Sequence, residues 1–115
     1  MKIYTSYYAN LKNIPSSIQP VSIAGKCPEW YHGTECKKLA PKKWFFNEWK
    51  KNGDNDFYVR NFNTEVLSVL DKEKVVEELK NLSYGRDVVL LCYETYDKFC
   101  HRHLVAEWLG GVTEF

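Results

Sequence analysis

The chain has 115 residues, enough for one ordinary domain, and it contains 4 Trp, 8 Tyr and 6 Phe. With 44% hydrophobic residues overall, this aromatic content excludes an intrinsically disordered chain. The formal net charge is only +1, so no strong basic field attracts nucleic acid or an anionic membrane. The longest aliphatic run, residues 88–91, is far shorter than a membrane span. Composition predicts a globular domain without nucleic-acid or membrane partners, and it leaves open whether copies form a homo-oligomer.

The four cysteines are too few for a disulfide scaffold, and the first ten residues lack the apolar stretch of a signal peptide. We therefore expect a cytoplasmic protein whose four cysteines are all free thiols. The Cys27–Cys36 and Cys92–Cys100 spacings contain no C-x-x-C motif, so the sequence predicts no metal centre and no cofactor. A metal site formed with His32 by the first pair is a minor alternative.

In the first third of the chain we expect two strands, at residues 3–6 and 19–24. In the second strand Val21 and Ile23 alternate with Ser22, the period of a half-buried strand. A loop is expected over residues 10–17, and a longer loop or lid over residues 26–39, where no clean period is visible.

Helices are expected in the middle of the chain. Pro41 suits a first helical position and Gly53 a helix end. A second helix is predicted over residues 57–70, with an inner stripe at every fourth position: Tyr58, Phe62, Val66 and Leu70. Asp71 is the predicted N-cap of a third helix that ends at Gly85.

Residues 88–93 are apolar without alternation, which is typical of a strand covered on both faces. A loop over 94–99, a helix from about Cys100 and a short edge strand at 112–115 complete the order. This order predicts a single α/β domain over residues 1–115, with a small, mostly parallel sheet flanked by helices.

The candidate site follows the buried strand, because ligands of open α/β sheets bind outside the carboxyl ends of the strands. Glu94 stands at that point, and Cys100, His101, Arg102 and His103 form the first turn of the next helix. A helix N-terminus attracts anions, and a guanidinium there can hold an anion with two hydrogen bonds. The alternative is that the guanidinium pairs with a neighbouring carboxylate, from Glu94 or Asp97, and fixes the loop.

Two further loops should open at the same edge of a parallel sheet. They contribute hydroxyl, amide, cationic and aromatic groups: Ser6, Tyr7, Asn10, Lys26, Trp30 and Tyr31. Such groups suit a small planar ligand, although the last two residues fit core packing equally well. The helical spacing of Trp44, Phe45 and Trp49 favours core packing over a binding site.

The residues of this region carry a family resemblance. VVLLCYE, a short loop and FCHRHLVAEWL resemble the C-terminal signature of the family catalogued as domain of unknown function 488, seen in bacteria and phages. IYTSYYANL, VSIAGKCPEWYHG, KKLAPKKWFF and the helix from Tyr58 to Asp71 resemble its smaller subclade. The resemblance spans almost the whole chain and implies a Rossmann-like α/β domain. By analogy it also suggests a nucleotide-derived ligand.

The leading hypothesis is a module that binds a small anionic, nucleotide-like molecule. The helix start at 100–103 and Lys26 would meet the anion. Hydrogen bonds would come from Ser6, Asn10 and Glu94, and stacking from Tyr7, Trp30 or Tyr31. In a phage, such a pocket would serve to sequester a host signalling nucleotide.

Two other functions are compatible with the same sequence. The first is a cysteine-dependent enzyme acting on a nucleotide-like substrate, with Cys100 as nucleophile, His101 or His103 as base, and Glu94 as acid–base or orienting group. The second is a protein-interaction module that docks through its aromatic surface.

Overall fold

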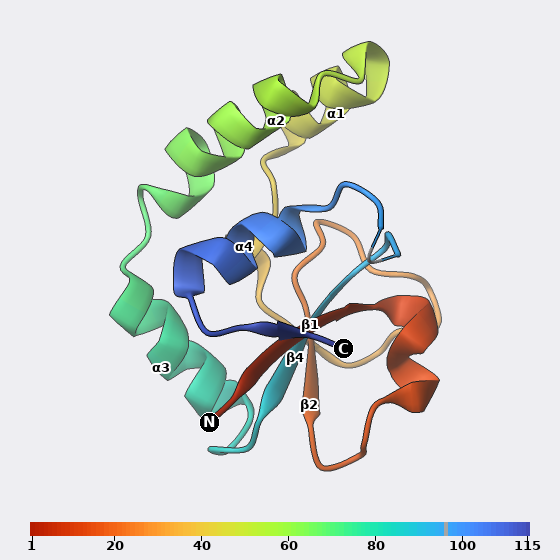
Figure 1. Ribbon diagram of the computed structural model, residues 1–115, viewed down its shortest axis with the longest axis vertical. Helices are drawn as coiled ribbons and strands as arrows, with labels where there is room; N and C mark the ends of the chain where they lie inside the picture. Colours follow the sequence, from red (N-terminus) through yellow and green to blue (C-terminus); the bar gives the residue numbers. More distant parts are fainter. Residues whose placement is uncertain (96) are drawn as a thin grey trace.

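A five-stranded parallel sheet forms the centre of the fold (Figure 1). The computed structural model describes residues 1–95 and 97–115, so the expected loop at 94–99 is described apart from residue 96. The strands are β1 (Ile3–Tyr7), β2 (Gln19–Ser22), β3 (Thr34–Glu35), β4 (Val88–Cys92) and β5 (Thr113–Glu114). Their spatial order is β3-β2-β4-β1-β5, which confirms the predicted α/β class and the edge strand near the C-terminus.

The central strand, β4, is buried along its whole length. It pairs with β1 in a register that places Ile3 opposite Val88, and with β2 on its other side. Its side chains alternate between two cores: Val88 and Leu90 join one, Val89 and Leu91 the other. The prediction of a strand covered on both faces is confirmed.

Helices cover one face of the sheet. They are α1 (Lys43–Asn52), α2 (Asn55–Phe62), α3 (Lys72–Leu82) and α4 (His101–Leu109), with the short helices η2 (Lys37–Leu39) and η3 (Asn63–Leu67). In Figure 1, α4 lies over β1 and β4, whereas α1 and α2 lie beyond it. Fully buried Phe45, Phe62 and Val105 pack with Val88 and Leu90 of the sheet in one core.

The opposite face carries no α-helix among the described residues. It is covered by η1 (Tyr8–Asn13) and by the chain that follows β2. Tyr8, Ala24 and Tyr31 pack there against Val89 and Leu91. The sheet is therefore covered by helices on one side and by an aromatic loop layer on the other.

Several predicted boundaries need correction. The helix after Pro41 begins two residues later, at Lys43, so the proline precedes the N-cap and does not fill the first helical position. The expected loop over 10–17 begins inside η1, and the loop over 26–39 contains β3 and η2. These are short elements without an apolar period of their own, and the pairing of Val21 with Thr34 in the next strand is a non-local contact.

The predicted helix over 57–70 begins earlier, at Asn55, and widens into a π-helical turn at η3. There the Ser68 backbone N–H donates to the carbonyl of Asn63, five residues before it. The additional residue in the turn lets both Val66 and Leu67 enter the core. The stripe positions Tyr58, Phe62 and Val66 are buried, Leu70 is partly buried against the same core, and Leu67 is buried in addition to the predicted positions.

Asp71 caps α3 as predicted, and its loss should destabilise the fold. The side chain accepts a hydrogen bond from the Lys74 backbone N–H at 3.2 Å. Asp71→Ala should lower the free energy of unfolding by about 1 kcal/mol, because this N–H loses its acceptor. Urea denaturation measures the change. Glu77→Ala, on the exposed side of the same helix, should stay within about 0.5 kcal/mol. Equal losses in both variants would contradict the capping role.

Candidate functional site

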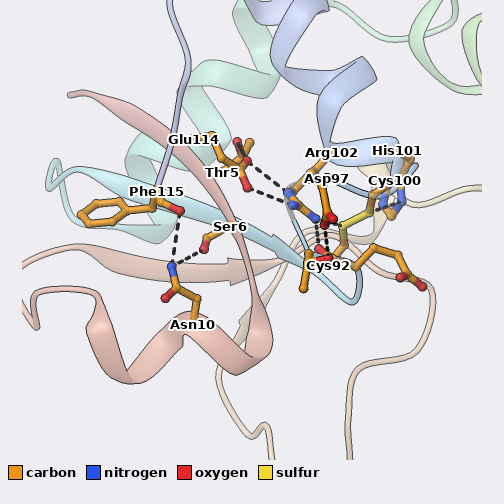
Figure 2. Close-up of polar contacts among 12 residues, drawn as sticks. Thr5, Ser6, Asn10, Cys92, Asp97, Cys100, His101, Arg102, Glu114 and Phe115 are labelled. Atoms are coloured by element: carbon orange, nitrogen blue, oxygen red, sulfur yellow. Dashed lines mark hydrogen bonds and ion pairs between the residues drawn. A yellow bond between two sulfur atoms is a disulfide. The ribbon is translucent and has the colours of Figure 1, made fainter.

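Arg102, in the first turn of α4, makes several polar contacts near the carboxyl end of β4 (Figure 2). Its side chain is fully buried. Its Nε and Nη2 donate to the two carboxylate oxygens of Glu114, at 3.2 and 2.9 Å. Its Nη1 donates to Cys92 Sγ at 3.1 Å and to the backbone carbonyl of Glu94. The guanidinium also lies over the Tyr7 ring, 5.9 Å from the ring centre. Its partners are therefore internal.

The carboxylate that pairs with this guanidinium is not one of the two neighbours that the sequence suggested, Glu94 and Asp97. It is that of Glu114 in β5. Thr5 Oγ1 donates to the same carboxylate at 2.6 Å. One buried cation thereby joins α4 to the carboxyl end of β4 and to the edge strand β5.

Two sulfur atoms meet beside the guanidinium. Cys92 ends β4, Cys100 is the N-cap of α4, and their sulfurs form a disulfide (Figure 2). The prediction that all four cysteines are free thiols is therefore wrong for this pair. It holds for half-buried Cys27 and for buried Cys36. The loop brings Cys100 back over the end of the strand it left, a return that the spacing alone does not reveal.

His101 is buried against the two sulfurs in a defined orientation. Its Nε2 donates to the backbone carbonyl of Ile23 at 2.7 Å, which leaves the Nδ1 lone pair free. Nδ1 lies 3.9 Å from Cys100 Sγ. Burial lowers the pKa of His101 to about 4, and the charges of Arg102 and His103 act in the same direction. The imidazole is therefore neutral at physiological pH.

A cleft of about 960 Å³ opens beside this cluster. Its walls come from α1, from the segment just before it, and from the loops after β2 and β4. Four lysines and one carboxylate line it: Lys26, Lys37, Lys43, Lys50 and Glu94. Five aromatic side chains complete the walls: Phe46, Trp49, Tyr58, Tyr93 and Phe99. The cleft is therefore cationic and aromatic.

Four of the predicted site residues line this cleft: Lys26, Glu94, Cys100 and His101. The loops after β1, β2 and β4 do open at one edge of the sheet, as expected from their parallel pairing. Arg102 donates to the Glu94 backbone, so this residue lies beside the first turn of α4 as predicted. The Glu94 carboxylate itself is exposed at the cleft.

The other predicted residues lie apart from the cleft. Asn10 donates to Ser6 Oγ at 3.1 Å and to the backbone carbonyl of Phe115, a group that Figure 2 shows away from the sulfurs. Tyr7 covers the buried guanidinium. His103 is half-buried, and burial lowers its pKa. The single shared pocket expected for all three loops is thus divided.

Trp30 and Tyr31 belong to the aromatic layer on the opposite face. Both contact Tyr8, with ring centres 6.2 and 5.6 Å from it, and Tyr93 contacts the same ring at 5.0 Å. Tyr31 is buried as core, whereas Trp30 is exposed. The Tyr93 hydroxyl donates to the Lys26 carbonyl, so Tyr93 links this layer to the cleft.

The cleft also contains residues that the sequence analysis assigned otherwise. Trp49 was expected in the core. It is partly buried against the core, but it also lines the cleft, with its ring centre 5.6 Å from that of Phe99. Trp44 is exposed, and only Phe45 of that group is fully buried. Two lysines of α1, Lys43 and Lys50, also line the cleft, and the sequence analysis gave them no role. In the sequence, the only sign of this cleft wall was that lysines stand close to aromatic residues in the helix. The same pattern is found on a helix face that is exposed to solvent.

Removing the charge of Glu114 should destabilise the fold. Glu114→Gln keeps the side-chain shape but leaves the buried Arg102 charge without a counter-charge. We expect a loss of about 2–3 kcal/mol in the free energy of unfolding, less than for fully enclosed pairs because the carboxylate is 27% exposed. Glu107→Gln, on the exposed side of α4, is the matched control and should change stability by less than about 0.5 kcal/mol. Similar unfolding midpoints for both variants would contradict this role.

Comparison with known proteins places the fold and cluster in a family. No curated protein and no solved structure matches the chain. In the part of the chain that the structure describes, no helix is long and apolar enough to cross a membrane. A family model described as the active DUF488-N3 subclade matches residues 9–111, a span that includes the sulfur cluster and every residue lining the cleft. The chain belongs to this subclade of the domain of unknown function 488 family.

Proposed function

We propose that the protein binds a small anionic, nucleotide-like ligand in the cleft beside α1. The observation that carries the proposal is the charge of the cleft, where four lysines face a single carboxylate although the whole chain has a net charge of only +1. Clefts lined by one sign of charge concentrate ligands of the opposite sign. A phosphate-bearing molecule matches this wall.

The aromatic side chains support a ligand that also has a planar part. Trp49 stacks on Phe46 at 5.9 Å and contacts Tyr58 at 5.2 Å, so its ring is held by neighbours on two sides. Rigid aromatic surfaces bind bases by stacking, largely independent of base identity. A volume of about 960 Å³ is within the range of cofactor-sized pockets.

In this proposal the cation that meets the anion is lysine. Lys26, Lys37 and Lys43 are exposed side chains at the cleft, whereas the Arg102 guanidinium is occupied by Glu114 and by the end of β4. Arg102 instead stabilises the end of β4 and the first turn of α4, at the base of the cleft. If the ligand is bound and later released without chemical change, the protein acts by sequestering it.

Reversing the charge of two cleft lysines should abolish most of the affinity. We expect Lys37→Glu/Lys43→Glu to weaken binding of ADP, measured by calorimetry, by roughly a hundredfold or more, because two charge-assisted contacts become repulsive. Lys74→Glu/Lys80→Glu changes the net charge equally but lies on α3, outside the cleft, and should change affinity only a few-fold.

Two further measurements complete this test. Adenosine, which lacks the phosphates, should bind much more weakly than ADP, and mass spectrometry of the purified protein should detect a released phosphorylated molecule. Equal loss in both double variants would assign the effect to net charge instead of the cleft. The proposal fails if ADP does not bind and no anionic molecule is released.

A second candidate function is a cysteine-dependent enzyme at the same position. The orientation of His101 favours it: the unprotonated Nδ1 faces Cys100 Sγ and could accept the thiol proton. The thiolate would then form a bond to an electrophilic centre of the substrate beside Glu94, while the bond to the leaving group breaks and the leaving group takes the proton from His101. This chemistry requires Cys100 as a thiol, so the disulfide must first be reduced.

Cys100→Ser separates the two functions. A serine hydroxyl is a far weaker nucleophile than a thiolate, so turnover of a nucleotide by the reduced protein should fall by several orders of magnitude. Chromatography of ADP incubated with the protein measures this turnover, and Cys27→Ser serves as the control. If the reduced parent converts no nucleotide while ADP still binds, the enzyme candidate is excluded and the binding function stands.

A further inference from the structure

We propose that Cys92, Cys100 and His101, once the two cysteines are reduced, bind one zinc-like divalent metal ion at the base of the cleft. This inference goes beyond ligand binding, because metal binding is measured without any ligand in the cleft. It also differs from the expectation of no metal centre, which was based on the spacing of the cysteines alone.

The three donor groups already lie together. The two sulfurs and one ring nitrogen of His101 are all within 4.8 Å of one another, and all three residues are buried. They come from the end of β4 and the start of α4, two elements held together by the Arg102 contacts. Two thiolates and an imidazole are a common donor set for zinc. Little movement would be needed to close the three groups on one ion.

The orientation of His101 is that of a metal ligand. A ligating histidine normally donates its second ring N–H to a carbonyl or carboxylate, which fixes the ring and aims its lone pair at the metal. Here Nε2 donates to the Ile23 carbonyl at 2.7 Å. Nδ1 is directed to the sulfurs and lies 3.9 Å from Cys100 Sγ. A tetrahedral zinc ion separates such a nitrogen and sulfur by about 3.6 Å.

The spacing of the backbone also suits shared coordination. The Cα atoms of Cys92 and Cys100 are 7.3 Å apart, whereas disulfides usually join Cα atoms about 4.4–6.8 Å apart. Zinc–sulfur bonds of about 2.3 Å place two ligating sulfurs about 3.8 Å apart, which allows the wider separation. Arg102 Nη1 donates to Cys92 Sγ at 3.1 Å, as outer hydrogen-bond donors do to metal thiolates.

Three protein ligands leave one coordination position of a tetrahedral ion unfilled. All three residues line the cleft, so this position is accessible from it. Zinc sites with three protein ligands and an open position bind water or an anionic group there, whereas structural zinc sites are closed by four ligands. The cluster therefore corresponds to a site at which the ion meets a molecule in the cleft.

The chemistry balances with one external reductant. A small dithiol reduces the Cys92–Cys100 disulfide by two electrons and two protons and becomes a cyclic disulfide itself. The divalent ion then displaces two protons from the two thiols and forms two metal–sulfur bonds. His101 contributes a neutral nitrogen and releases no proton.

Cobalt binding tests the proposal directly. The full chain is reduced with a dithiol, freed of reductant without oxygen, and titrated with Co²⁺. We expect one Co²⁺ per chain, a sulfur-to-cobalt charge-transfer band, and the intense ligand-field bands of tetrahedral cobalt. Zinc should abolish these bands by displacing the cobalt. The proposal is overturned if the reduced protein shows no charge-transfer band or if the band does not saturate at one ion per chain.

Matched variants assign the ligands. Cys92→Ser and Cys100→Ser should each weaken cobalt binding by at least about a hundredfold, the upper end of the effect of losing an outer-shell contact. Cys27→Ser and Cys36→Ser remove free cysteines outside the cluster and should leave the bands unchanged. Bands that persist in the first pair, or disappear in the second, overturn the assignment.

Protection of the parent protein keeps the test independent of how the variants fold. Zinc should protect Cys92 and Cys100 of the reduced parent from alkylation, located by peptide mass spectrometry, and a chelator should restore their reactivity. Equal alkylation with and without zinc overturns the proposal. Failure of these metal measurements leaves the ADP affinity of the cleft unchanged, so it is distinguishable from failure of the proposed ligand-binding function.

Discussion

The buried guanidinium of Arg102 is the constraint on which the arrangement of this site depends. A charge removed from water is tolerated only when partners surround it, and here they come from two segments of the chain. The end of β4 and the residues just after it contribute Cys92 Sγ and the Glu94 carbonyl, and β5 contributes Glu114. These contacts fix β5, the end of β4 and the first turn of α4 relative to one another. The positions of both sulfurs and of His101 follow from that fixed turn.

The same constraint separates the charge that stabilises the fold from the charges that line the cleft. Arg102 carries a planar set of donors that suits a carboxylate held by two hydrogen bonds, and the fold uses it there. The cleft instead presents flexible lysines from α1 and the neighbouring loops. Lysines adapt to phosphates in several positions. The proposed anion site can therefore vary in detail without disturbing the buried pair.

The sequence predicted those elements of the fold that depend on neighbouring residues. The apolar run of β4, the Asp71 cap and the stripe from Tyr58 to Val66 each follow from neighbouring residues, and the structure confirms them. The parallel order then placed the loops at one edge. The Arg102–Glu114 pair joins α4 to β5. Its formation depends on the pairing of β5 with β1, and no periodicity reports such a pairing.

The three chemistries available at the sulfur cluster exclude one another. A disulfide withholds both sulfurs, a metal ion uses both as ligands, and a nucleophilic Cys100 requires a free thiolate beside an unligated His101. In each state a different chemical group lies at the base of the cleft, whereas the lysines and aromatic residues of its walls stay the same. If the proposed functions hold, the cleft determines which class of molecule is bound, and the supply of reductant and metal determines whether that molecule meets a disulfide, a metal ion or a nucleophile.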